Sequence, residues 1–79
     1  MSKYDSLYAH LSNCPHSMVK MSFVEIAGLV GGLPASATDY RAWWSNEAEG
    51  SHVQAKSWMA AGYEVTEVEL GSWVVFSKK

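Results

Sequence analysis

The stretch that organises this chain reads Asp39-Tyr40-Arg41-Ala42-Trp43-Trp44-Ser45-Asn46, and the segment after it reads Ser51-His52-Val53-Gln54-Ala55-Lys56-Ser57-Trp58. Between them they hold three of the four tryptophans. Tryptophan combines a large apolar surface with one N–H donor, which needs a partner when it is buried. The arginine, amide and imidazole groups beside these rings could recognise a planar or anionic partner. We therefore expect both core residues and binding residues in these two segments.

Length and composition predict one small domain over residues 1–79. The chain has 79 residues, of which 48% are apolar and 13% aromatic, so it can build one hydrophobic core and is not disordered by composition. Its single cysteine, Cys14, cannot form an internal disulfide, which fits a reducing compartment. The sequence shows no signal peptide, and no apolar run approaches the roughly 18 residues of a membrane span. We expect a cytoplasmic protein that makes no membrane contact.

The charge balance argues against strong non-specific binding to DNA. The net charge is −2, from six Lys and Arg against eight Asp and Glu. A protein that nucleic-acid phosphates hold in place usually carries a visible basic excess. Here the positive residues are scattered along the chain, whereas the carboxylates partly cluster at Glu47, Glu49, Glu64, Glu67 and Glu69.

Local signals predict a helix, a strand and a second helix before the aromatic stretch. Apolar residues recur at i, i+3, i+4 and i+7 from Tyr4 to Leu11, the pattern of a short amphipathic helix, and Pro15 lies beyond its end. Residues 17–21 form a strand candidate. Ser22 and Glu25 then make a Ser-x-x-Glu capping box, which predicts a helix that ends at Gly31-Gly32.

Two more helices are expected around the aromatic stretch. A short one would run over residues 37–44, with Ser36 or Asp39 as its cap. The next would begin at a second capping box, formed by Ser51 and Gln54, and would run as far as residue 61.

The C-terminal residues predict a hairpin. Its strands would lie at 63–70 and 73–77, and Gly71-Ser72 suits a two-residue turn. A three-helix core whose first strand pairs with a C-terminal hairpin is the winged helix-turn-helix layout. We therefore predict an α+β fold, winged helix-turn-helix-like, with three to four short helices and a small antiparallel sheet.

Three segments also suggest a family. They are Tyr40 to Asn46, His52 to Trp58, and Ala61-Gly62-Tyr63. Their pattern resembles one that recurs in small uncharacterised bacterial and phage proteins, and the resemblance spans nearly the whole chain. Members of that family commonly have tryptophan where this chain has Tyr63. The resemblance implies a standalone prokaryotic domain and adds little about its chemistry.

The first functional interpretation is a non-catalytic binding domain that contacts nucleic acid through an aromatic and polar cluster. In a winged helix, the helix over 52–61 would enter the major groove, with the hairpin tip as the wing. However, apolar residues fall on two opposite sides of this helix, which is more typical of a core helix than of a base-reading one. The predicted binding residues are Tyr40, Arg41, Trp44, Asn46, His52, Gln54 and Lys56.

The adjacent rings of Trp43 and Trp44 cannot point the same way on a regular helix or strand. One is expected in the core and the other at the surface, where it could stack on a base beside Arg41 and Asn46. Alternatively, Arg41 pairs with Asp39 or with a glutamate of the following loop, and Asn46 only caps a turn. This alternative requires no ligand.

Two other functions remain open. One is a protein–protein module, an inhibitor or adaptor of phage or mobile-element origin that antagonises a host defence. Its carboxylates would face a basic partner, and tryptophan and arginine are frequent interface anchors. The other is a pocket for a small nucleotide-like ligand, which requires the two aromatic segments to frame a cavity.

No enzymatic activity, cofactor or metal is predicted. Cys14 has no clear activating neighbour, and the sequence contains no nucleophile elbow and no glycine-rich phosphate loop. His10, Cys14 and His16, with His52 as a possible fourth ligand, lack the paired spacing of zinc sites.

Overall fold

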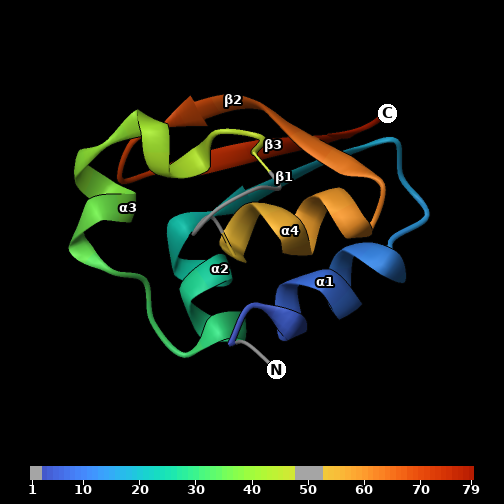
Figure 1. Ribbon diagram of the computed structural model, residues 1–79, viewed down its shortest axis with the longest axis horizontal. Coiled ribbons are helices and arrows are strands. Elements are labelled where there is room, and N and C mark those ends of the chain that lie inside the picture. Colours follow the sequence, from blue (N-terminus) through green and yellow to red (C-terminus); the bar gives the residue numbers. More distant parts are fainter. Residues whose placement is uncertain (1–2, 48–52) are drawn as a thin grey trace.

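The computed structural model describes residues 3–47 and 53–79 and shows an α+β fold (Figure 1). The described residues form four α-helices, one 3-10 helix and a three-stranded antiparallel sheet. The elements in chain order are α1 (Asp5–Ser12), β1 (Met18–Ser22), α2 (Phe23–Val30), α3 (Ala35–Asp39), the 3-10 helix η1 (Arg41–Trp44), α4 (Val53–Ala60), β2 (Tyr63–Glu69) and β3 (Trp73–Lys78). Within these residues, no helix is long and apolar enough to cross a membrane.

The sheet has the strand order β1-β3-β2, so the first strand pairs with the last and the hairpin strand β2 forms the other edge. Helices α1, α2 and α4 lie on one side of it (Figure 1). Side chains alternate between the two faces of a strand. Val74 and Phe76 therefore point into the core, where both are fully buried, whereas Val75 between them lies outside the core cluster.

Helix α2 confirms the predicted capping box. The Ser22 hydroxyl accepts the Glu25 N–H at 3.0 Å, and the Glu25 carboxylate accepts the Ser22 N–H at 2.9 Å. The bond from the Ser22 N–H lowers the pKa of the Glu25 carboxyl, and the nearby Ser22 hydroxyl lowers it further, because both groups stabilise the charged form. The helix ends as expected at Gly31, whose φ of 78° lies in the left-handed region that favours glycine.

The single helix predicted over 37–44 is wrong. The chain instead forms α3 and then η1, with extended backbone at Tyr40 between them. Helix α3 begins after Pro34 and has no side-chain cap, so neither Ser36 nor Asp39 has the predicted capping role. The break at Tyr40 turns η1 back toward the core, where the Trp44 indole donates to the Ala37 carbonyl at 2.8 Å.

The hairpin also differs from its prediction. Strand β2 pairs with β3 as far as Glu69 and Trp73, so three residues rather than two connect the strands. The Ser72 N–H closes the turn on the Glu69 carbonyl at 2.9 Å, and Gly71 supplies the positive φ of 81°. A bulge between Val65 and Glu67 interrupts the register of the two strands.

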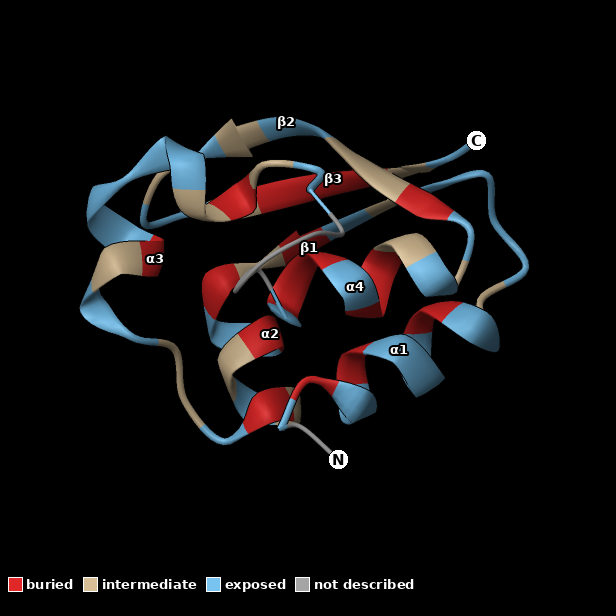
Figure 2. Ribbon diagram, viewed as in Figure 1, coloured by how far each residue is buried: buried red, intermediate tan, exposed pale blue. Residues whose placement is uncertain are grey.

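The core is a layer of aromatic and aliphatic side chains between sheet and helices (Figure 2). Trp44 and Trp58 are 2% and 0% exposed and stack with their ring centroids 5.8 Å apart. Phe23 packs on one side of this pair and Phe76 on the other. Aromatic contacts of this kind add to the free energy of burying the rings. Trp44 and Trp58, one from each of the two sequence segments, are therefore central residues of the core.

Candidate functional site

The predicted binding residues of the first segment converge on the outer edge of β2. Because β2 is an edge strand, some of its backbone N–H and C=O groups have no neighbouring strand. Those of Val65 and the carbonyl of Val68 are instead bonded by side chains from the segment over 41–46. Natural sheets need such protection against pairing with other chains.

Asn46 binds the edge with both ends of its amide. Its Nδ2 donates to the Val65 carbonyl at 2.9 Å, and its Oδ1 accepts the Val65 N–H at 2.8 Å. The same Oδ1 accepts the indole N–H of the buried Trp58 at 2.9 Å. Asn46 therefore does more than cap a turn, since it joins the sheet edge to the core through three hydrogen bonds.

Arg41 binds the same edge three residues further along β2. Its Nη1 donates to the Val68 carbonyl at 2.8 Å, so among the described residues its partner is the backbone of β2 rather than Asp39 or Glu47. The side chain is exposed, and a guanidinium has five N–H donors. Arg41 therefore supports the edge and still presents donors to solvent.

Two of the predicted binding residues are core residues. The Trp44 ring is buried and bonded within the fold, so its assignment as a surface contact is wrong. Gln54 is 6% exposed and donates to the Trp43 carbonyl at 3.0 Å, which ties α4 to η1. The predicted partner of Gln54 in a capping box, Ser51, lies outside the described residues.

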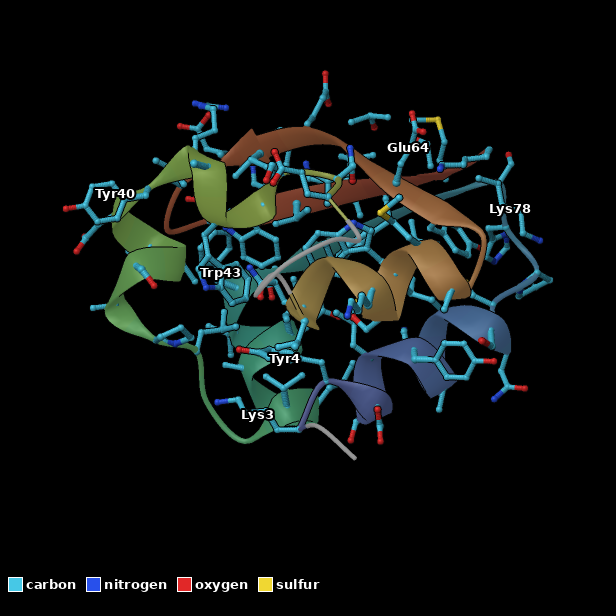
Figure 3. The ribbon with its side chains drawn as sticks, in the orientation of Figure 1. Lys3, Tyr4, Tyr40, Trp43, Glu64 and Lys78 are labelled. Carbon is cyan, nitrogen blue, oxygen red and sulfur yellow. The ribbon has the colours of Figure 1, made fainter. Side chains whose placement is uncertain are left out.

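The other predicted residues are not gathered at this edge. Tyr40 is 65% exposed and points away from the body of the molecule (Figure 3). Lys56 is exposed on α4, where it borders a shallow groove with Asp5 and Tyr8 of α1. His52 lies outside the described residues. Trp43 is the half-buried ring of the pair, and it packs edge-on against both Trp44 and Tyr4.

A groove of about 440 Å³ runs between η1 and the bulge of β2. Arg41, Asn46 and the edge of Trp44 line it from one side, and Thr66 and Glu67 from the other. The lining comes from the first aromatic segment and β2, so the groove is not the cavity between the two segments that a nucleotide-like ligand requires. A second groove, of about 510 Å³, is lined by His10, Cys14 and His16 beside α1.

The possible metal ligands of that second groove do not converge. Among the described residues, no group of three or more His, Cys, Asp or Glu side chains is placed to hold a metal ion. The loop after α1 is instead held by Tyr63, whose hydroxyl donates to the His16 carbonyl and lies 3.2 Å from the Cys14 carbonyl. Burial, with the nearby Cys14, raises the pKa of the Tyr63 hydroxyl above its ordinary value.

The sheet face opposite the helices carries three of the carboxylates noted in the sequence, Glu64, Glu67 and Glu69, together with Trp73, which the sequence patterns did not single out. Directly paired residues on neighbouring strands point to the same face. The register therefore places three rows across this outer face, each read from β1 through β3 to β2: Ser22, Trp73 and Glu69; Lys20, Val75 and Glu67; Met18, Ser77 and Glu64. Strict alternation in β3 around the two core residues could have indicated that Trp73 faces outward.

The outer face combines an aromatic ring, one cation and three carboxylates. The Lys20 ammonium lies 4.4 Å from the centroid of the Trp73 ring, a cation–π contact. Met18 is 64% exposed at one end of the face. Glu64 lies on the side of β2 that points away from the helices (Figure 3).

The chain belongs to a family described as a domain of unknown function (DUF7662), whose match covers residues 4–79. No curated protein and no solved structure matches the chain. Membership agrees with the expected small uncharacterised domain. The tryptophan motif as a family signature and the phage origin stay predictions.

Proposed function

We propose that this domain binds a protein partner and has no catalytic role. The observation that carries the proposal is the distribution of charge on the described surface. The carboxylates Glu64, Glu67 and Glu69 follow one strand and face the same way. The cations, apart from the neighbours Lys78 and Lys79, come from different elements: Lys20 from β1, Arg41 from η1 and Lys56 from α4. Figure 3 shows Lys3 and Lys78 on opposite sides of the molecule. A surface of this kind suits a basic partner better than it suits phosphates.

The structural roles of the predicted cluster support the same conclusion. Arg41 and Asn46 are bonded to the backbone of β2, and Trp44 and Gln54 lie in the core. Few groups of the cluster are left to read bases or to bind a nucleotide. An inhibitor or adaptor, of the phage or mobile-element kind that the sequence resemblance suggests, is the form of protein binding that we favour.

Nucleic-acid binding is the second candidate, and the topology is what favours it. The order of helices and strands, with β1 paired to the C-terminal hairpin, supports a winged-helix-like assignment. Helix α4 would then hold the recognition position. Its described residues oppose that role, because Lys56 is its one exposed cation and no described residue of the hairpin turn is basic. Fold analogy alone is a weak guide to function.

One experiment separates the two candidates. We would titrate the protein with short duplex and single-stranded oligonucleotides at low salt and follow tryptophan fluorescence. In parallel, the tagged protein would be incubated with bacterial lysate before and after nuclease treatment. Protein binding predicts no saturable response to oligonucleotides and capture of a partner that survives nuclease. Saturable quenching that weakens with salt would support nucleic acid instead, and capture that nuclease abolishes would contradict the proposal.

A further inference from the structure

We propose that the outer face of the sheet, defined by the three cross-strand rows of β1, β3 and β2, docks an extended Lys- or Arg-rich segment of a partner protein. This inference rests on the proposed protein-binding function and names its surface and the chemistry of its partner. The face is a built surface rather than a chance cluster, because the strand register fixes which side chains share it.

The bulge in β2 is what aligns the carboxylates. Glu64 and Glu67 are three positions apart, so a regular strand would place them on opposite faces. The register shift between Val65 and Glu67 restores Glu67 to the outer face, opposite Val75. Bulges commonly redirect side chains at functional surfaces. Here the bulge brings Glu64, Glu67 and Glu69 to one face of β2, whereas regular alternation would have placed Glu64 on the opposite face from the other two.

The three carboxylates have no partner within the described part of the chain. No hydrogen bond or ion pair joins Glu64, Glu67 or Glu69 to another described side chain. Like charges on one face of a sheet repel one another and destabilise the fold slightly. The nearest cation of the face, Lys20, lies over Trp73 instead of pairing with them. These three carboxylates are therefore accessible to cations from another molecule.

The spacing of the three carboxylates along β2 fits an extended partner segment. Alternate residues of a β-strand lie about 6.6 Å apart on one face. The three carboxylates of β2 have about this spacing, because they lie opposite Ser77, Val75 and Trp73, which are alternate residues of β3. An extended segment with a cation at every second residue would present charges at the same interval. Trp73 and Met18, at the two ends of the face, would contact the aliphatic parts of the lysine or arginine side chains of that segment.

A substitution at Lys20 should change the affinity for a basic segment in the opposite direction from a substitution at the carboxylates. Its ammonium occupies the face of Trp73 and would repel a basic segment that docks beside it. Removing the Lys20 charge should therefore strengthen binding, whereas removing carboxylate charges should weaken it. A partner that used Lys20 as a contact, such as an acidic segment or a phosphate, would give the reverse order.

The probe is a nine-residue peptide of alternating lysine and threonine, titrated into ¹⁵N-labelled protein at low salt. We expect saturable amide shifts at β2 and β3, and an affinity that falls about tenfold in Glu67→Gln/Glu69→Gln, at the upper range for two exposed ion pairs. Lys20→Gln should bind about twofold to threefold more tightly. Asp5→Asn/Asp39→Asn, a matched charge change on α1 and α3, should bind like the wild type. Thermal melts check that each variant is folded.

Several outcomes would overturn the inference. Equal weakening in both double variants would show attraction by net charge alone, and shifts confined to the groove beside η1 would move the site to the β2 edge. Weaker binding in Lys20→Gln would contradict a basic partner. A dimer in sedimentation that Glu67→Gln/Glu69→Gln disrupts would identify a second copy as the occupant. Nuclease-resistant capture of a partner without these peptide effects would leave protein binding intact and refute only this surface.

Discussion

The most direct test of the structure is Asn46→Ala, because one side chain holds both the edge of β2 and the core. Truncation removes the two bonds to Val65 and the acceptor of the Trp58 indole. Trp58 is fully buried, and its indole N–H would lose its acceptor. The effect should therefore exceed that of an ordinary surface substitution.

The magnitude follows from the three contacts. The two exposed bonds to Val65 are worth about 1 kcal/mol together, and a buried donor left unsatisfied costs about 1–3 kcal/mol. The expected loss is about 2–4 kcal/mol, against a total of roughly 4–12 kcal/mol for a chain of this length. In a domain this small, such a loss lowers Tm by about 8–30 °C.

Thermal and urea unfolding, followed by circular dichroism, would measure the loss. Hydrogen exchange should also speed up at the Val65 amide and the Trp58 indole. Asn46→Asp keeps the acceptor for both N–H groups but sets a carboxylate oxygen against the Val65 carbonyl in place of the Nδ2 donor, so we expect this variant to lose stability as well. Ser45→Ala is the neighbouring control. A change below about 0.5 kcal/mol in Asn46→Ala, the range of ordinary surface substitutions, would refute the role assigned to this amide.

Three further predictions concern stability. Trp44→Ala should cost about 3–5 kcal/mol and more than Trp43→Ala, because only the Trp44 ring is fully in the core; equal urea midpoints would contradict this. Ser22→Ala should cost about 1 kcal/mol by removing a helix cap. The backbone N–H of residue 22, the main cause of the lowered Glu25 pKa, remains in this variant, and only the smaller effect of the hydroxyl is lost. The stability that Glu25 contributes above about pH 4.5, and that disappears as the pH falls and the carboxyl is protonated, should therefore be reduced only in part. Gly71→Ala should cost about 1–2 kcal/mol from its positive φ, and an unchanged Tm would argue against that turn.

The candidate site illustrates where sequence patterns were informative and where they were not. The segment over 41–46 was correctly identified as a place where polar and aromatic groups meet. Its contacts within the fold were not predictable, because adjacency along the chain does not tell whether an amide faces solvent or a sheet edge. Asn46 and Arg41 find their partners 19 and 27 residues away along the chain. No local pattern predicts bonds over that separation.

Local sequence signals are sufficient for four features: the amphipathic stripe of α1, the capping box of α2, the glycine that ends it and the C-terminal hairpin. Hydrogen bonds within a few residues and side-chain periodicity decide such features. Three others follow from the packed fold: Trp44 is buried, Asn46 closes the edge of β2, and the bulge sets Glu67 beside Glu64 and Glu69. These depend on strand register and on contacts between distant segments, which form only when the whole core is packed.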